Sequence, residues 1–251
     1  MCFDLDSAPP IPVIAGAALS HDDLVLTAAD GTELAAFLAT PDDPSRVGVV
    51  VLPDVRGLYH FYEELALRFA ERGYSALAID YFGRTAGVAK RDDAFEYMPH
   101  VEQTTSAGVT ADTAAAVARL REAGCESIFT VGFCFGGRNS WLQAAGGHGL
   151  AGAIGFYGRP TGEGRDGSPS PVDRVGEMTC PVLALQAGDD GHILAEDNSA
   201  FDAALTAAGV EHEVVTFAGA PHSFFDRKYE EFADASADAW QRTLAFITAN
   251  A

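Results

Sequence analysis

Long apolar runs, paired cysteines and basic residues are all scarce in this sequence of 251 residues. No uninterrupted apolar stretch approaches the roughly 20 residues that a membrane-spanning helix needs. The acidic N-terminal segment, MCFDLDSAPP, has neither the basic start nor the apolar stretch of a secretory signal peptide. The four cysteines form no CxxC pair and are too sparse for a disulfide scaffold. These absences predict a cytoplasmic protein with reduced thiols and no membrane partner.

The shortage of basic residues gives the chain a strong negative charge. Lys and Arg number 16 against 36 Asp and Glu, so the formal net charge is −20. A surface of this sign repels phosphate backbones and anionic lipids, which disfavours binding to nucleic acids or membrane surfaces. The sequence also has no glycine-rich dinucleotide loop and no constellation of metal-ligating residues. We therefore expect no cofactor and no metal.

What the sequence does contain is an alternation of apolar strands and amphipathic helices. The segment 47–52 (VGVVVL) is continuously apolar and β-branched, as expected for a strand buried on both faces. Phe61, Leu65 and Phe69 recur every four residues before a glycine, which predicts a helix over 60–72. The predicted strands are 24–28, 33–39, 47–52, 74–79, 127–131, 151–156, 181–186 and 211–217. The predicted helices are 60–72, 109–123, 135–145, 194–208 and 228–249.

This alternation indicates an α/β fold, with helices on both faces of a mostly parallel central sheet. Asp30-Gly31 between the first two strands is a hairpin signal, which predicts an antiparallel N-terminal edge. The region 83–107 has mixed composition, and we expect at most one helix in it, over 89–97. The segment 158–171 is rich in Gly, Pro and Ser and is predicted to be a loop. No linker interrupts the chain, so we expect an N-terminal arm (1–23) and one domain (24–251).

The strongest chemical signal is the segment Val-Gly-Phe-Cys-Phe-Gly-Gly at 131–137. A predicted strand ends at Val131 and a predicted helix starts near Phe135, so Cys134 lies in a sharp strand-to-helix turn. Gly-x-Cys-x-Gly is the pattern of a nucleophile elbow, with sulfur in place of the usual serine oxygen. The helix N-terminus favours a thiolate and a developing oxyanion. We interpret Cys134 as a nucleophile; the alternative is a small buried thiol.

A general base and its acid follow in the chain order expected for such a nucleophile. Asp190 comes after the predicted strand 181–186, and His222 comes after the predicted strand 211–217. Both residues leave the carboxyl ends of strands, where ligands of open α/β sheets gather. We predict that His222 takes the proton of Cys134 and later gives it to the leaving group, while Asp190 fixes the tautomer of the ring.

Both assignments have alternatives within the sequence. A lone Gly-Asp-Asp-Gly segment is also a common turn, and of its two acids Asp189 is the better turn residue. His192 is a rival to His222, although it stands too close to Asp190 to follow a separate strand. A lone histidine is more often a surface or structural residue than a catalytic one.

Five segments together resemble the dienelactone hydrolase family of α/β-hydrolases. They are LPDVRG (52–57), GYSALAIDY (73–81), GFCFGG (132–137), GDD (188–190) and PHSF (221–224). The resemblance implies an α/β-hydrolase fold and the hydrolysis of a lactone or carboxylic ester through a thioacyl-enzyme, with a Cys134–His222–Asp190 triad. The implied partner is a small-molecule lactone or ester. The sequence leaves a monomer and a homodimer equally open.

The same resemblance implies an oxyanion hole formed by the backbone N–H groups of Val55 and Phe135. It also implies an acid that contacts the resting thiol and helps govern its ionisation. The founding members of the family have glutamate for this acid, whereas Asp54 stands at the matching position here.

Substrate-binding residues are implied in the same way. Arg84 and Arg227 match arginines that hold a substrate carboxylate, Arg227 standing five residues past His222. Tyr157 matches a pocket residue. The alternatives are surface salt bridges for the two arginines and a core aromatic role for Tyr157.

Other functions share parts of this pattern. Glutamine amidotransferase-like proteins also use Gly-x-Cys-x-Gly, but their later histidine is followed two residues on by glutamate, where this chain has Phe224. A hydrolase fold can also serve as a non-catalytic binding or thiol redox-sensing module through Cys134. A broader-specificity esterase or thioesterase is a third alternative. An intact triad favours an enzyme over the non-catalytic module.

Overall fold

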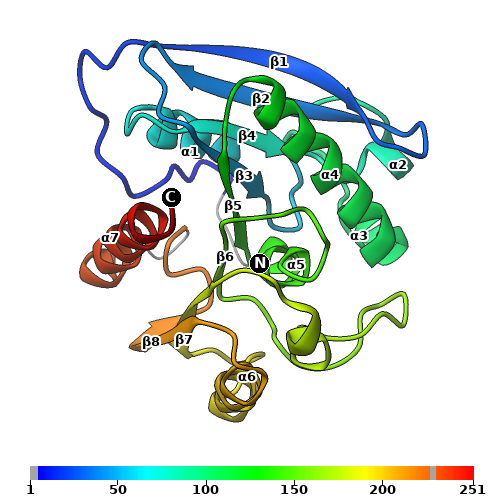
Figure 1. Cartoon of the computed structure of the whole chain (residues 1–251), viewed down its shortest axis with the longest axis vertical. Helices are drawn as coiled ribbons and strands as arrows, with labels where there is room; N and C mark the ends of the chain where they lie inside the picture. The colour runs from blue at the N-terminus through cyan, green and yellow to red at the C-terminus, as the bar shows by residue number, and fades with distance from the viewer. Residues whose placement is uncertain (1–4, 227–229) are drawn as a thin grey trace.

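The computed structural model describes residues 5–226 and 230–251 of the chain. Within them, eight strands form one sheet, and helices cover both of its faces (Figure 1). The strands are β1 (Leu19–Thr27), β2 (Glu33–Pro41), β3 (Val47–Leu52), β4 (Ser75–Ile79), β5 (Ser127–Phe133), β6 (Gly152–Phe156), β7 (Val182–Asp189) and β8 (His212–Pro221). The helices are α1 (His60–Ala70), α2 (Gly83–Ala86), α3 (Met98–Gln103), α4 (Ser106–Glu122), α5 (Phe135–Gln143), α6 (Ala195–Ala208) and α7 (Ala233–Asn250), with a 3₁₀ helix η1 (Val172–Glu177).

The strand order is β1-β2-β4-β3-β5-β6-β7-β8. β1 pairs antiparallel with β2, and β2 pairs antiparallel with β4, whereas every later pairing from β4 to β8 is parallel. The predicted α/β fold with an antiparallel N-terminal edge is therefore confirmed. Parallel strands need crossover connections, and the helices between them supply these crossovers.

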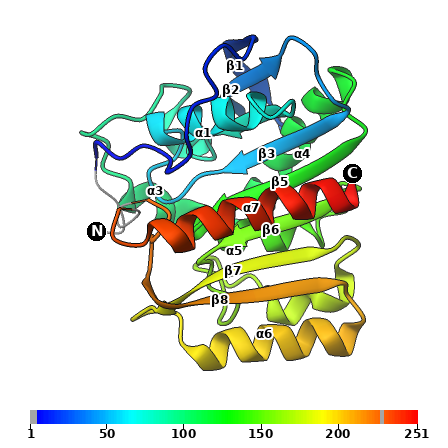
Figure 2. The same cartoon turned by 90° about the vertical axis from the view of Figure 1, so that its left-hand side faces the viewer.

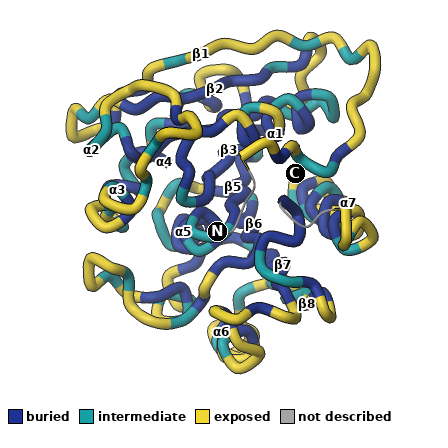
Figure 3. Tube along the Cα trace, turned by 180° about the vertical axis from the view of Figure 1, so that it is seen from behind, coloured by how far each residue is buried: buried dark blue, intermediate teal, exposed yellow. Residues whose placement is uncertain are grey.

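Two hydrophobic cores lie on opposite faces of the sheet. One contains side chains of α1 and α7, and the other contains side chains of α4, α5 and α6. In Figure 2, α1 and α7 lie in front of the strands, on the near face of the sheet. All six residues of β3 are buried, and the central strands run through the most buried part of the chain (Figure 3). Because helices pack on both faces of the sheet, the ends of the central strands hold the loops that follow them in fixed positions.

The region between β4 and α4 differs from the sequence prediction. The prediction of a helix over 89–97 is wrong. Two short helices, α2 and α3, flank this segment instead. The Arg91 guanidinium donates to Asp80 and to the backbone carbonyls of Ala86 and Gly87, which holds the segment against the end of β4. Tertiary contacts of one buried arginine therefore override the local helix propensity.

Both ends of the domain also differ in detail. β1 begins at Leu19 rather than at residue 24, and α7 begins at Ala233 rather than at 228. Within the segment predicted to be an arm, Ile11 is buried in the core on the α1 side, and the N–H of Ile14 donates to Glu71 of the segment that follows α1. Among the described residues, no helix is both long and apolar enough to cross a bilayer.

Candidate active site

Strand register brings the predicted site residues to one edge of the sheet. Leu52 of β3 pairs with Gly132 of β5, and Phe133 pairs with Phe156 of β6. The residues that follow these strands, 53–55, Cys134 and Tyr157, therefore leave the sheet side by side. On the other side of β6, Asp189 at the end of β7 pairs with Pro221 of β8, so the next residues of the two strands, Asp190 and His222, are neighbours. All of these positions lie at the carboxyl edge of the parallel strands, where such sheets bind ligands.

Cys134 occupies a strained turn between β5 and α5. Its φ is 54° and its ψ is −111°, a left-handed conformation that a non-glycine residue rarely adopts. The turn is tight because a Cβ added at Gly132 would lie 2.0 Å from the carbonyl oxygen of Gly136, and one at Gly136 would lie 2.0 Å from that of Leu52. Backbone strain of this kind, on a cysteine at a helix N-terminus, has the geometry of a nucleophile elbow.

Replacement of Gly136 by alanine tests this packing. The new methyl group would overlap backbone that cannot move without displacing β3, so we expect the free energy of unfolding to fall by roughly 2–3 kcal/mol in urea denaturation. Gly176 is the matched control, since an added Cβ there meets nothing within 4 Å. A Gly136→Ala protein as stable as Gly176→Ala would contradict the close approach.

Asp190 and His222 form a short hydrogen bond. Nδ1–H of His222 donates to Oδ2 of Asp190 at 2.6 Å, while Oδ1 accepts the backbone N–H groups of His192 at 2.9 Å and Ile193 at 3.2 Å. Burial acts to raise the pKa of Asp190, but the hydrogen bond and electrostatic attraction of His222, together with the two N–H groups, lower this pKa overall. Asp190 is therefore an ionised, fixed acceptor that keeps the ring proton on Nδ1.

The lowered pKa of Asp190 predicts a pH dependence of stability. An acid whose pKa is lower in the folded state contributes stability above its unfolded pKa of about 3.9, and this contribution is lost as the pH falls through the folded value. We expect the wild type to be more stable than Asp190→Asn at neutral pH, with the difference shrinking below about pH 4. Urea denaturation across this range measures it. A difference that persisted unchanged in acid would contradict the assignment of an ionised Asp190.

A cavity of about 480 Å³ opens beside the elbow. Five of the residues predicted from the sequence line it: Val55, Cys134, Phe135, Tyr157 and His222. Tyr157 is buried, has a positive φ of 36°, and its ring centroid lies 5.0 Å from that of His222. The rest of the lining comes from residues 101–109, from the predicted loop 158–171, which begins directly after Tyr157, from α5 (Arg138, Asn139 and Leu142), and from His192 and Ile193 after β7. The cavity therefore unites the candidate nucleophile and base with the two candidate oxyanion donors.

Asp54 is buried directly before Val55. Its carboxylate accepts the backbone N–H and the guanidinium of Arg56, and its own N–H donates to the hydroxyl of Tyr62. Burial raises the pKa of Tyr81 well above its usual value, and the negative charges of Asp54, Asp80 and Cys134 add to this effect. The Tyr81 hydroxyl donates to the backbone carbonyl of Asp54 at 3.2 Å. A contact between Asp54 and the thiol stays a prediction.

Two arginines, Arg84 and Arg227, are predicted from the sequence to bind a substrate carboxylate. Arg84 is not among the residues that line the cavity; its guanidinium binds Asp30, Thr32 and Asp112. The salt-bridge alternative therefore describes Arg84, and the short α2 helix positions it toward the β1–β2 turn rather than toward the elbow. Arg227 lies outside the described residues, and its role stays a prediction.

Three residues around the site, Arg138, Arg56 and Asp226, were not predicted from the sequence. Arg138 lines the cavity four residues after Cys134, one helical turn along α5, a spacing that could have revealed it. Arg56 stands inside the motif 52–57, but nothing local indicates its long-range partner Asp226.

Among the described residues, no group of three or more His, Cys, Asp or Glu side chains is arranged to hold a metal.

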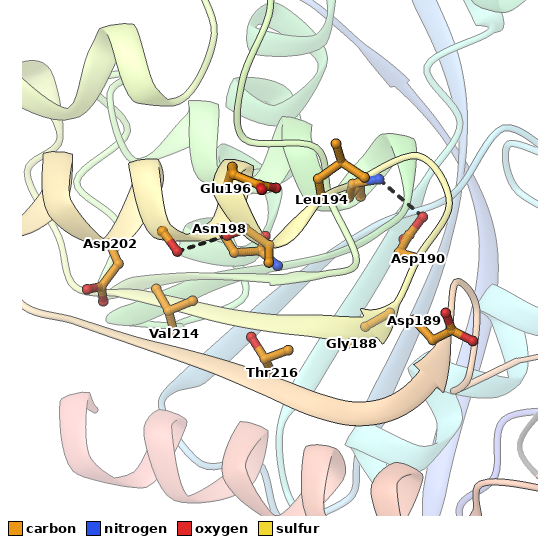
Figure 4. A pocket seen from close by; sticks show the side chains of 13 residues that line it. Gly188, Asp189, Asp190, Leu194, Glu196, Asn198, Asp202, Val214 and Thr216 are labelled. Atoms are coloured by element: carbon orange, nitrogen blue, oxygen red, sulfur yellow. Dashed lines mark hydrogen bonds between the residues drawn. The ribbon is translucent and has the colours of Figure 1, made fainter.

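A second hollow, of about 520 Å³, lies on the other side of Asp190 and extends along α6 (Figure 4). Figure 4 shows the side chains of Asp189 and Asp190 pointing in different directions from the end of β7. Asp189 is exposed, whereas Asp190 is buried. This agrees with the choice of Asp190 over Asp189, and neither Cys134 nor His222 lines this hollow.

A mostly parallel sheet with an antiparallel edge, and a strained strand-to-helix turn that presents a nucleophilic side chain at the carboxyl edge, defines an α/β-hydrolase. The particular family follows from sequence comparison. The sequence model of the Dienelactone hydrolase family matches residues 34–250, and the chain therefore belongs to this family. The protein is therefore a hydrolase.

Known relatives agree with this assignment. A "Putative carboxymethylenebutenolidase" of Yersinia pestis is 30% identical over 226 residues, covering 87% of this chain and 84% of the relative. A protein with the same description in Escherichia coli (strain K12) is also 30% identical to this chain, over 225 residues. The crystal structure of a "Putative Dienelactone Hydrolase" from Klebsiella pneumoniae has a TM-score of 0.81 at 26% identity, covering 92% of this chain and 99% of that one.

Proposed function

We propose that the protein hydrolyses a lactone or a carboxylic ester through a thioacyl-enzyme on Cys134, with His222 as general base and Asp190 as its orienting acid. One observation carries the proposal: the strained Cys134 and the Asp190-bound His222 line the same cavity. Names of relatives that refer to a carboxymethylenebutenolidase support a cyclic ester as the substrate.

In the acylation step, His222 accepts the thiol proton as Sγ attacks the carbonyl carbon of the ester. With its own proton held on Nδ1 by Asp190, the neutral ring presents Nε2 as the acceptor. The carbonyl oxygen becomes an oxyanion, which the N–H groups of Val55 and Phe135 stabilise. The carbon–oxygen bond to the alcohol then breaks, and His222 returns the proton to the leaving oxygen.

In the deacylation step, a water molecule attacks the thioester carbonyl while His222 takes its proton. The same oxyanion hole stabilises the second tetrahedral intermediate, the carbon–sulfur bond breaks, and the proton restores the thiol. For a lactone, the leaving alcohol stays attached to the acyl chain, so the product is one hydroxy acid. The tautomer that Asp190 enforces serves both steps.

The cavity is lined by three arginines and two acids, Glu163 and Asp166, and this excess of positive charge favours a substrate that carries an anion. Arg138, Arg159 and Arg165 line it, and none of the three forms an ion pair with a carboxylate of residues 5–226 or 230–251. Burial lowers the pKa of Arg138, and the positive charge of Arg159 lowers it further, with Asp166 and Asp173 opposing. In a chain of net charge −20, such cations are available for a substrate carboxylate.

The two exposed arginines of this group give a test of substrate charge. In the double variant Arg159→Gln/Arg165→Gln, we expect KM for an ester with a free carboxylate to rise about 10-fold, with KM for its uncharged methyl ester changed less than 2-fold. Arg242→Gln, on α7, is the control for general surface charge. Equal changes in KM for both substrates would contradict the proposed anionic subsite. They would not contradict the proposed ester hydrolysis.

The proposed activity itself is tested with p-nitrophenyl acetate and a panel of lactones, wild type against Cys134→Ala. We expect turnover by the wild type only. A wild type that hydrolyses none of these esters, or a Cys134→Ala variant that hydrolyses them equally well, would refute the proposal.

A further inference from the structure

Arg56 is the centre of a buried ion cluster beneath the catalytic cavity. Its side chain is 3% exposed, and Nε lies 3.1 Å from each carboxylate oxygen of Asp54. One terminal nitrogen lies 2.9 Å from Oδ2 of Asp54 and also donates to Asp226, while the other donates to Ser7 at 3.3 Å. Both carboxylates are as deeply buried as the guanidinium. One cation therefore binds two acids with little access for water.

The two acids belong to the two loops that the reaction depends on. Asp54 directly precedes Val55, the proposed oxyanion donor after β3. Asp226 follows His222 by four residues in the loop after β8. Arg56 and Asp226 are 170 residues apart in sequence, and their ion pair joins loops that leave the sheet on opposite sides of Cys134.

The rest of the environment fixes the guanidinium in place. The aromatic rings of Tyr59, Phe61 and Tyr62 surround it, with ring centroids 5.3, 5.2 and 5.5 Å from Cζ. Burial acts to lower the pKa of Arg56, but the charges of its partners raise it overall, so the group stays cationic. Such clusters are weak evidence of net stabilisation, because desolvation of three charges offsets their attraction. Fixing a conformation is the better-supported role for a buried charge that joins two loops.

Backbone contacts show what the cluster adds. The Tyr62 hydroxyl accepts the N–H of Asp54, and the Tyr81 hydroxyl donates to the backbone carbonyls of residues 53 and 54. These bonds anchor the loop after β3, which carries Val55, to the body of the domain. Within residues 5–226 and 230–251, neither tyrosine hydroxyl hydrogen-bonds to the loop that carries His222, whereas Arg56 reaches this loop through Asp226. The guanidinium thus joins the two loops by a direct ion pair.

We propose that Arg56 is a positioning residue that clamps the Val55 and His222 loops together, so that oxyanion donor and base face the Cys134 sulfur at the same time. This inference rests on the proposed function. A lysine at this position keeps the charge but lacks the planar fork that binds both carboxylates. A misplacement of about 1 Å at a catalytic group costs on the order of 100-fold in rate.

The test compares Arg56→Lys and Asp226→Asn with Arg68→Lys. Arg68 is the matched control: it is equally buried and pairs with Glu64 and Glu71 around α1, away from the cavity. We expect kcat for ester hydrolysis to fall about 10- to 100-fold in the first two variants, with KM changed less than 3-fold. Alkylation of Cys134 by iodoacetamide forms no oxyanion, and at a pH high enough to ionise the thiol without the base its rate should change less than 3-fold. Arg68→Lys should keep its kcat even if its melting temperature falls equally.

A second measurement does not depend on turnover. Hydrogen exchange of the amides at 54–58 and 222–226 should accelerate together in Arg56→Lys and in Asp226→Asn, but not in Arg68→Lys. Acceleration of one loop alone, or a kcat loss that Arg68→Lys reproduces, would overturn the clamp. A wild type without esterase activity whose two loops still exchange as a pair would refute the proposed function and leave the clamp standing.

Discussion

Cys134→Ala is expected to lower kcat for ester hydrolysis by about 10⁴-fold or more, to the level of the residual catalysis that binding and the oxyanion hole provide. The reason is chemical, since alanine offers no atom to form the acyl intermediate. Initial-rate measurements on the best ester of the panel check it. Because Cys134 is only half-buried and its backbone is held by the elbow, we expect little change in the melting temperature.

Two further cysteine variants sharpen this result. Cys180→Ala is the control, since burial raises the pKa of Cys180 to about 11 and it lies away from the cavity lining. We expect that variant to keep the wild-type kcat. Cys134→Ser should retain some activity, but less than the wild type, because an alkoxide needs a stronger base than a thiolate does. A serine variant as fast as the wild type would argue against thiolate chemistry.

Asp190→Asn has the second-largest expected effect, a fall in kcat of about 10³- to 10⁴-fold with KM nearly unchanged. The asparagine amide can donate to Nδ1, so the ring is free to adopt the tautomer whose proton lies on Nε2 and which cannot accept the thiol proton. Steady-state kinetics at neutral pH measure the loss.

Asp189→Asn serves as the control for Asp190→Asn, because the neighbouring acid is exposed and points elsewhere. We expect its kcat to stay within 2-fold of the wild type. Equal losses in the two variants would mean that charge at the end of β7, rather than the bond to His222, is what matters. Loss in Asp189→Asn alone would reverse the assignment of the two acids.

Much of this site could be predicted because its signals are local. The elbow is specified by five consecutive residues, since Gly132 and Gly136 lie where backbone leaves no room for a side chain. Apolar strands of the right length, in the right order, then carry the acid and the histidine to the same edge. The fold prediction succeeded for the same reason, because strands buried on both faces are continuous apolar runs.

The parts that could not be predicted depend on contacts between distant segments. Nothing near Arg84 in the sequence indicates that Asp30 and Asp112 enclose it, and nothing near Arg56 indicates Asp226, 170 residues away. The segment 89–97 failed as a helix because Arg91 is recruited by the buried Asp80. In each case an ion pair decides the structure, at separations from 11 to 170 residues, and periodicity carries no information about such pairs.

The cavity arginines illustrate a related limit. Arg159 and Arg165 stand in a loop rich in Gly, Pro and Ser, where a surface role is the ordinary expectation. Only the path of the loop across the mouth of the cavity brings them near Arg138, whose guanidinium donates to the carbonyls of Arg159, Thr161 and Gly162. The proposed anionic subsite therefore depends on loop geometry that composition does not reveal.

The proposed mechanism requires that the acyl group of the substrate be bonded to the sulfur of Cys134 during turnover. Rapid acid quench of the wild type with a slowly deacylating ester, followed by peptide mass spectrometry, tests it most directly. We predict one acyl group on the peptide that contains residue 134, formed and lost at rates consistent with kcat. Full turnover without an adduct, or an adduct on any other residue, would contradict the account.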